Sequence, residues 1–301
     1  MLTVERLTKT YRGHNAVRDL SFTVPDGQVT GFLGPNGSGK STTMRMCVGL
    51  ETPTSGTATF DGQAFRGLRH PSRVVGTLLD ATWFHPGRTA RAHLAAMAAL
   101  AGLPTSRVDE VLDRVGILQV AQRKVGGYSL GMKQRLGLAC ALLGDPAHIL
   151  LDEPVNGLDP EGVHWMRDQI RQFAAEGRAV LVSSHLLSEM ALTADRLVVI
   201  GRGELIGSGT VEEFVGAAGS GTVEAEVSDP TTLVAALAGQ GIAAEREGDT
   251  VTVTDTAVTT TLIGELCLDH RIVIRSLTRA TPSLEEAFLG ATADAVEYRA
   301  V

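Results

Sequence analysis

The sequence of 301 residues contains no long hydrophobic run. A membrane-spanning helix needs about 20 consecutive, mostly apolar residues, and the longest candidate, residues 94–103, is too short. The opening segment, MLTVERLTKTYRG, has no continuous apolar core of the kind that a secretory signal peptide requires. We therefore expect neither a membrane span nor a signal peptide, so that work at a membrane would require docking to another protein.

The sequence also contains few cysteines and has no excess of basic residues. The 3 cysteines, Cys47, Cys140 and Cys267, are scattered through apolar, helix-like segments, which favours buried hydrophobic residues of a reducing compartment over disulfides or a metal site. The formal net charge of −7 offers no basic excess to a nucleic acid, so no nucleic-acid partner is expected. The sequence also lacks a His-Glu-x-x-His metal motif, a paired-cysteine zinc site and a Gly-x-Ser-x-Gly nucleophile elbow.

The order of apolar segments predicts a large α/β domain, residues 1–215. Strands are expected at residues 28–33, 148–151, 179–183 and 197–200. A helix is expected at residues 40–50, and residues 89–143 should be mainly helical. A run of small residues, 216–221, reads as a linker.

A second, smaller α+β domain is expected over residues 222–301. Its predicted strands and helices are residues 222–227, 231–238, 242–247, 250–254, 257–269 and 272–276. Their β-α-β-β-α-β order fits a ferredoxin-like module. Ser283 and Glu286 have the spacing of a capping box at the start of a final helix.

The strongest chemical signal is a glycine-rich loop between a predicted strand and a predicted helix. It matches the phosphate-loop pattern G-x-x-x-x-G-K-S and consists of Gly34, Pro35, Asn36, Gly37, Ser38, Gly39, Lys40, Ser41 and Thr42. Its glycines let backbone N–H groups turn toward phosphate oxygens, and the following helix presents its positive end to them. We expect Lys40 to reach the terminal phosphates of ATP and the Ser41 hydroxyl to ligate Mg²⁺. A plain glycine-rich turn is the alternative.

Two acidic residues follow the apolar strand predicted at residues 148–151. Asp152 and Glu153 would lie at the sheet edge where a nucleotide on the phosphate loop would also lie. Asp152 suits a water-mediated contact to magnesium, and Glu153 suits the general base that polarises the attacking water. An apolar strand ending in acids is more often plain structure, but its pairing with the phosphate loop favours the catalytic interpretation.

Between these motifs lies the segment Tyr128-Ser129-Leu130-Gly131-Met132-Lys133-Gln134-Arg135. Here the chain resembles an ABC-type nucleotide-binding domain, a P-loop NTPase fold with a helical subdomain, whose signature reads approximately Leu-Ser-Gly-Gly-Gln. Ser129 and Gly131 are kept, and the other three signature positions differ. Similar variants occur in the exporter branch that this chain resembles, which includes the bacitracin and lantibiotic self-protection transporters.

The resemblance implies roles for three further residues. Asp159, in the segment 156–160, matches the D-loop aspartate that communicates across a dimer. His185 follows a predicted strand and matches the switch histidine that contacts the γ-phosphate. Tyr11 resembles the aromatic residue that stacks on adenine, with a packing role as the alternative.

One position departs from the family pattern. The family has glutamine, sometimes glutamate, in the loop after the strand near residues 74–76, and alignment by eye places Asp80 there. Asp80 is shorter and charged, and we expect it to be a ligand of magnesium. Residues 83–86 are expected to face the helical subdomain and the groove where a permease helix docks, with core packing as an equal alternative.

The resemblance implies a head-to-tail pair in which the phosphate loop of one subunit and the signature of the other enclose each ATP. One chain carries one copy of each motif, so a second copy is expected, together with a separate transmembrane permease that holds the chain at the cytoplasmic face of the membrane. Residues 281–289 resemble accessory domains of drug, antibiotic and lipid exporters, which favours export. The alternative is a soluble ABC ATPase acting on a ribosome, DNA or a protein complex. Such proteins commonly carry two ATPase domains or long coiled-coil insertions, and neither is visible here.

Overall fold

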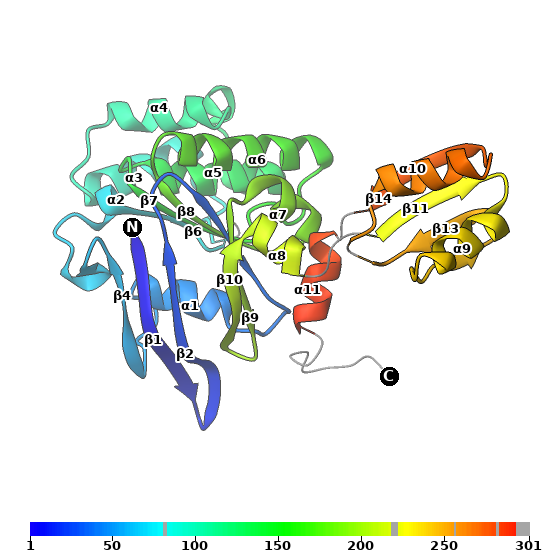
Figure 1. Cartoon of the computed structure of the whole chain (residues 1–301). Helices are drawn as coiled ribbons and strands as arrows, with labels where there is room; N and C mark the ends of the chain where they lie inside the picture. Colours follow the sequence, from blue (N-terminus) through cyan, green and yellow to red (C-terminus); the bar gives the residue numbers. More distant parts are fainter. Residues whose placement is uncertain (81–82, 218–221, 256, 281–282, 293–301) are drawn as a thin grey trace. The chain divides into compact units, whose positions relative to one another are not determined.

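The computed structural model describes residues 1–80, 83–217, 222–255, 257–280 and 283–292 (Figure 1). These residues form two compact units, Met1–Thr210 and Val211–Ala291. The smaller unit therefore begins with helix α8, Val211–Ala217, ahead of the glycine-rich segment. Within the described residues, no helix is long and apolar enough to cross a membrane.

A mainly parallel sheet forms the centre of the larger unit. Its strands, in spatial order, are β10 (Glu204–Thr210), β9 (Arg196–Gly201), β3 (Val29–Leu33), β8 (Ala179–Ser184), β7 (His148–Asp152) and β6 (Val75–Leu78), and only β10 runs antiparallel to its neighbour. Strands β3, β7 and β8 are almost continuously apolar because helices or a second sheet cover both faces. Their carboxyl ends meet at one edge, where an α/β fold binds its ligands.

A second, antiparallel sheet packs beside the first. It contains β2 (His14–Val24), β1 (Leu2–Tyr11), β4 (Ser55–Phe60) and β5 (Gln63–Ala64). Helix α1, Lys40–Cys47, buries Met44 and Met46 in the same hydrophobic core as Phe22 and Phe32, whose ring centroids lie 5.2 Å apart. The helix ends before the expected residue 50 because the amides that follow it turn back to the carbonyls of its last turn.

The region expected to be mainly helical contains α3 (Ala90–Leu100), α4 (Ser106–Arg114) and α5 (Leu130–Leu142), which pack against one another. Further helices are α2 (Pro71–Val74), α6 (Pro160–Ala175) and α7 (Leu187–Thr193). Both long helices next to the functional loops start at a side-chain cap: the Ser129 hydroxyl accepts the Met132 amide of α5, and the Asp159 carboxylate accepts the Gly162 amide of α6.

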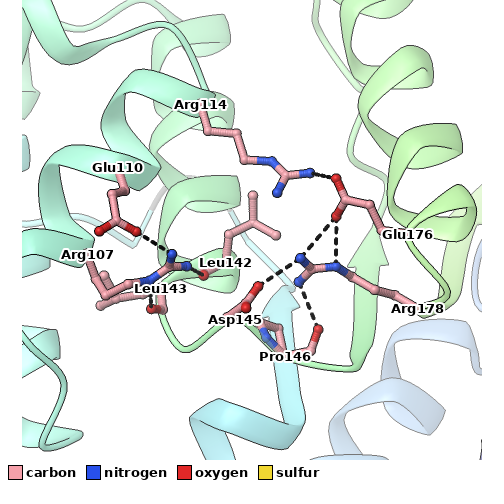
Figure 2. Close-up of polar contacts among 9 residues, drawn as sticks. All are labelled: Arg107, Glu110, Arg114, Leu142, Leu143, Asp145, Pro146, Glu176 and Arg178. Atoms are coloured by element: carbon pink, nitrogen blue, oxygen red, sulfur yellow. Dashed lines mark hydrogen bonds and ion pairs between the residues drawn. The ribbon is translucent and has the colours of Figure 1, made fainter.

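A polar cluster joins α4 to the opposite end of the central sheet (Figure 2). Arg107 donates hydrogen bonds to the last carbonyl groups of α5, which have no partner within the helix. Arg114 pairs with Glu176 at 2.5 Å, and Arg178 bonds both Glu176 and Asp145. The cluster thus ties the helical region to the turns before β7 and β8, away from the edge where the functional loops meet.

The smaller unit has the expected β-α-β-β-α-β order. It consists of β11 (Thr222–Val227), α9 (Pro230–Gly239), β12 (Glu245–Glu247), β13 (Thr250–Val253), α10 (Thr260–Asp269) and β14 (Ile274–Ala280), and its antiparallel sheet has the order β12-β13-β11-β14. Inward-facing Val223, Ala225 and Val227 alternate with exposed Glu224 and Glu226, which gives one buried and one open sheet face. This is the ferredoxin-like arrangement.

Two details of the smaller unit bear on the sequence-based expectations. The strand expected at residues 242–247 starts only at Glu245, because the amide of Ile242 closes the end of α9 by donating to the carbonyl of Leu237. The capping box is confirmed at α11, Leu284–Thr292: the Glu286 amide donates to the Ser283 hydroxyl at 3.2 Å, and the Ser283 amide donates to the Glu286 carboxylate at 2.7 Å.

Candidate functional site

The phosphate-loop residues surround a cavity of about 250 Å³ at the carboxyl end of β3. Its lining consists of His14, Ala16, Asn36, Gly37, Ser38, Gly39, Lys40, Ser41, Thr42 and Glu153. Gly39 precedes α1 with φ of 103°, a conformation that favours glycine. The hydroxyl oxygen of Ser38 is buried and has no hydrogen-bond partner within the described chain. A cavity with N–H groups, a cation and a spare hydroxyl at a helix N-terminus suits an anionic phosphate.

Lys40 lies across its own loop. Its Nζ donates to the carbonyl of Gly34 at 2.6 Å and to that of Pro35 at 3.1 Å. Burial lowers the pKa of Lys40, and the nearby carboxylates of Glu153 and Asp152 oppose that shift. A bound phosphate would add further negative charge next to this buried ammonium group and so stabilise its charged form.

The two predicted acids lie at the end of β7, beside β8. Asp152 is opposite Ser183 in the parallel pairing of these strands, and the Ser183 hydroxyl donates to Asp152 Oδ1 at 2.5 Å. Glu153 has φ of 49°, which turns its chain out of the strand, and its side chain lines the phosphate-loop cavity. Glu153 Oε2 lies 2.6 Å from Nδ1 of His185, so these two residues, distant in sequence, contact each other directly.

The signature segment lies at a second cavity, of about 230 Å³, between α5 and α6. Ser129, Gly131 and Asp159 line it, and among the described residues none lines both this cavity and the phosphate-loop cavity. Tyr128 fills a buried position, and its hydroxyl donates to the carbonyl of Val120 at 2.8 Å. The first signature departure is therefore a packing residue whose polar atom is satisfied.

The signature and the D-loop interlock through reciprocal leucine–glycine contacts. A Cβ placed on Gly157 would lie 2.4 Å from Leu130 Cδ2, and one placed on Gly131 would lie 3.5 Å from Leu158 Cδ2. Leu130, which stands where the family has glycine, therefore rests on the backbone of the D-loop. The second signature departure links two segments that both line the signature cavity.

Other predicted residues lie apart from the phosphate-loop cavity. Tyr11 is 41% exposed at the end of β1, with Lys9 Nζ 4.8 Å from its ring centroid, and it is not among the described residues that line the cavity. Asp80 follows β6, the strand that pairs in parallel with β7. Asp80 is likewise not among the described residues that line the cavity. Trp83 is 69% exposed, whereas the ring of Phe84 packs edge-on against His93.

Sequence reasoning missed three residues that the fold brings to the site. His14 and Ala16 line the phosphate-loop cavity from β2, and Ser183 bonds Asp152. Only Ser183 carried a usable signal, because it is a polar residue at the end of an otherwise apolar buried strand.

Residues 17–156 match the family model described as ABC transporter. An uncharacterized ABC transporter ATP-binding protein of Bacillus subtilis, YhcH, is 36% identical, and the alignment covers 99% of this chain and 97% of that protein. The chain belongs to the ABC transporter family of ATP-binding proteins. The family resemblance drawn from the motifs is thereby confirmed, and the phosphate-loop cavity belongs to an ABC-type ATPase, which binds ATP.

Two further comparisons agree. The bacitracin transport ATP-binding protein BcrA of Bacillus licheniformis is 41% identical over 66% of this chain and 66% of its own length. A solved structure of an ATP-binding subunit of an ABC transporter superposes with a TM-score of 0.66 at 26% identity, and covers 72% of this chain and 92% of that one. The expected α/β nucleotide-binding fold is confirmed.

Proposed function

We propose that this ABC ATPase is the energy-coupling subunit of an exporter and works with a separate transmembrane permease at the cytoplasmic face of the membrane. The contact of Glu153 with His185 at the edge of the phosphate-loop cavity carries the ATPase part of the proposal. The similarity of 99% of the chain to an ABC transporter ATP-binding protein supports its link to transport. The similarity to a bacitracin transport protein supports export, with a peptide antibiotic, a drug or a lipid-like molecule as the substrate class.

In this proposal several residues in and around the cavity have defined tasks. The loop amides, Lys40 and the unpartnered Ser38 hydroxyl bind the phosphates of ATP. Glu153 takes a proton from the attacking water, and His185 holds Glu153 Oε2 in place while its ring faces the γ-phosphate. Tyr11 stacks on the adenine from the end of β1.

The oxygen atoms that Ser41 and Asp152 offer fit Mg²⁺. The Ser41 hydroxyl and the Asp152 carboxylate would hold it, because hydroxyl, carboxylate and phosphate oxygens are the ligands that Mg²⁺ prefers. When bound, the ion neutralises the charge of the phosphates. We propose Asp80 as an additional ligand, and Asp80→Ala should then weaken the Mg²⁺ dependence of ATP binding. Unchanged Mg²⁺ affinity in that variant would assign Asp80 another role.

A second copy of the chain completes the site. In the part of the chain that the structure describes, the phosphate-loop cavity and the signature cavity share no lining residue, which supports a site in which the signature of another copy encloses the ATP. In a head-to-tail pair, Ser129 and the N-terminus of α5 donate to the γ-phosphate held by the partner, and Asp159 contacts the partner's site. Size-exclusion chromatography of Glu153→Gln should show a dimer with ATP and a monomer without it.

We propose that the ferredoxin-like unit stabilises that dimer or regulates it. Removal of residues 222–301 should then change dimerisation, ATPase rate or transport, and a truncated chain that retains all three would refute this role. The exporter proposal is tested separately by fractionating cells that express the tagged full-length chain. The chain should sediment with membranes after a high-salt wash, and recovery only with ribosomes or in the soluble fraction would contradict the proposal.

A further inference from the structure

Two serines stand side by side at the end of β8, immediately before His185, and they make different contacts. The side chain of Ser183 faces β7, where its hydroxyl donates to Asp152 Oδ1 at 2.5 Å and accepts the backbone amide of Glu153 at 2.9 Å. Ser184 faces the other way, because successive side chains of a strand alternate, and its hydroxyl accepts the amide of Leu186 at 2.9 Å. Both serines are fully buried.

The single hydroxyl of Ser183 therefore bonds both acidic residues of the site. A hydroxyl has one proton to donate, and here that proton goes to Oδ1 of Asp152. The bond holds Oδ1 and restrains the rotation of the carboxylate, which sets the direction in which Oδ2 points. A lone pair of the same hydroxyl oxygen accepts a hydrogen bond from the backbone amide of Glu153, directly after the end of β7.

The bond to Glu153 matters because of the backbone of that residue. Glu153 has φ of 49°, in the left-handed region that non-glycine residues rarely adopt, and surrounding contacts must hold such a residue in place. The Ser183 hydroxyl holds the amide of this turn, and His185 Nδ1 holds the carboxylate at 2.6 Å. The backbone and the side chain of the proposed base are thus both held by residues at the end of β8 and directly after it.

We propose that Ser183 is a positioning residue that orients Asp152 toward Mg²⁺ and Glu153 toward the attacking water through one hydroxyl group. The inference rests on the roles proposed above for Asp152 and Glu153. It adds that the strand that leads into the switch histidine also sets the geometry of the metal-binding carboxylate. Hydrogen-bond partners of ligating carboxylates typically contribute about 10- to 100-fold to metal affinity or activity.

The test compares Ser183→Ala with Ser184→Ala in the full-length chain. Mn²⁺, a spectroscopic substitute for Mg²⁺, is titrated against each variant in the presence of a non-hydrolysable ATP analogue and followed by electron paramagnetic resonance. Ser183→Ala should weaken Mn²⁺ binding about tenfold and lower the ATPase rate, while binding of the analogue without metal stays unchanged. Ser184→Ala should keep the Mn²⁺ affinity of the wild type. Ser183→Thr, which retains a hydroxyl group, should also bind Mn²⁺ with an affinity close to that of the wild type.

Wild-type Mn²⁺ affinity in Ser183→Ala, or an equal loss in Ser184→Ala, would overturn the proposal. Asp152→Asn separates this result from failure of the proposed function, because unaltered Mn²⁺ affinity in that variant would remove the metal role of Asp152 itself. If Ser183→Ala does not fold, Ser183→Cys gives the same comparison, since it offers only a weak S–H donor in nearly the same volume. A cysteine variant that folds and binds Mn²⁺ like the wild type would equally refute the role of Ser183.

Discussion

Replacing Gly39 by alanine should disrupt nucleotide binding through two separable effects. The first is conformational, because φ of 103° lies in a region that L side chains rarely adopt. The second is steric, because the added Cβ would lie 2.5 Å from the carbonyl oxygen of Ala16 and 3.1 Å from Val17 Cγ2. The first of these contacts is with the backbone of β2, which cannot move aside as a flexible side chain would.

Gly37 provides the matched control on the same loop. Its φ is 81°, but a Cβ added there meets no atom within 4 Å. Both alanine variants should lose about 1–2 kcal/mol to the left-handed backbone, which corresponds to roughly a tenfold loss of ATP affinity if the strain is relieved in the unbound loop. Gly39→Ala should lose at least about another factor of ten through the clash with β2.

Equilibrium titration with a fluorescent ATP analogue measures both affinities, and a thermal melt of each variant reports any general loss of stability. The predicted order of affinity is wild type, then Gly37→Ala, then Gly39→Ala. Equal losses in the two variants would show that the contact with Ala16 is irrelevant. Wild-type affinity in Gly39→Ala would refute the assignment of this loop as the phosphate cradle.

Three further predictions concern other parts of the site. Glu153→Gln should bind ATP but release phosphate about 10²- to 10⁴-fold more slowly, and normal turnover would assign the general base to another residue. Gly157→Ala should lower the ATPase rate, because its Cβ would lie 2.4 Å from Leu130 Cδ2. Leu130→Gly added to that variant removes this contact but not the backbone strain at Gly157, whose φ is 71°. The rate should therefore recover in part, and no recovery would show that the interlock is not the cause. Because burial lowers the pKa of Lys40, ATP affinity should fall with rising pH from below the ordinary lysine range, as the ammonium loses its proton. Titrations of ATP binding at a series of pH values test this prediction. Lys40→Ala is the control, and its ATP affinity should be lower than that of the wild type and independent of pH. A wild-type affinity that stays constant up to the ordinary pKa range of lysine would contradict the prediction.

The parts of the site that depend on local sequence were predictable. The phosphate loop is contiguous, and Asp152 and Glu153 directly follow an apolar strand, so spacing alone indicates their chemistry. The contact between Ser183 and Asp152 joins residues 31 positions apart and depends on the register of β7 and β8, which the sequence does not specify by itself. The reciprocal contacts of the signature with the D-loop likewise depend on how α5 and α6 pack.

Element boundaries show the same limit. The order of the smaller unit followed from alternating apolar residues, such as those of β11. The apolar residue Ile242 looked like the start of a strand, yet its amide closes the end of α9. Periodicity does not distinguish these two uses of an apolar residue, because both bury it.

The measurement that tests the central claim most directly is a pull-down from native membranes. Tagged Glu153→Gln is incubated with ATP, so that the closed dimer persists, and the proteins recovered with it are identified by mass spectrometry, with Lys40→Ala as the control defective in nucleotide binding. We predict recovery of a polytopic membrane protein with the Glu153→Gln dimer. Recovery of ribosomal or DNA-associated proteins, with no membrane protein, would contradict the account and favour a soluble ABC ATPase.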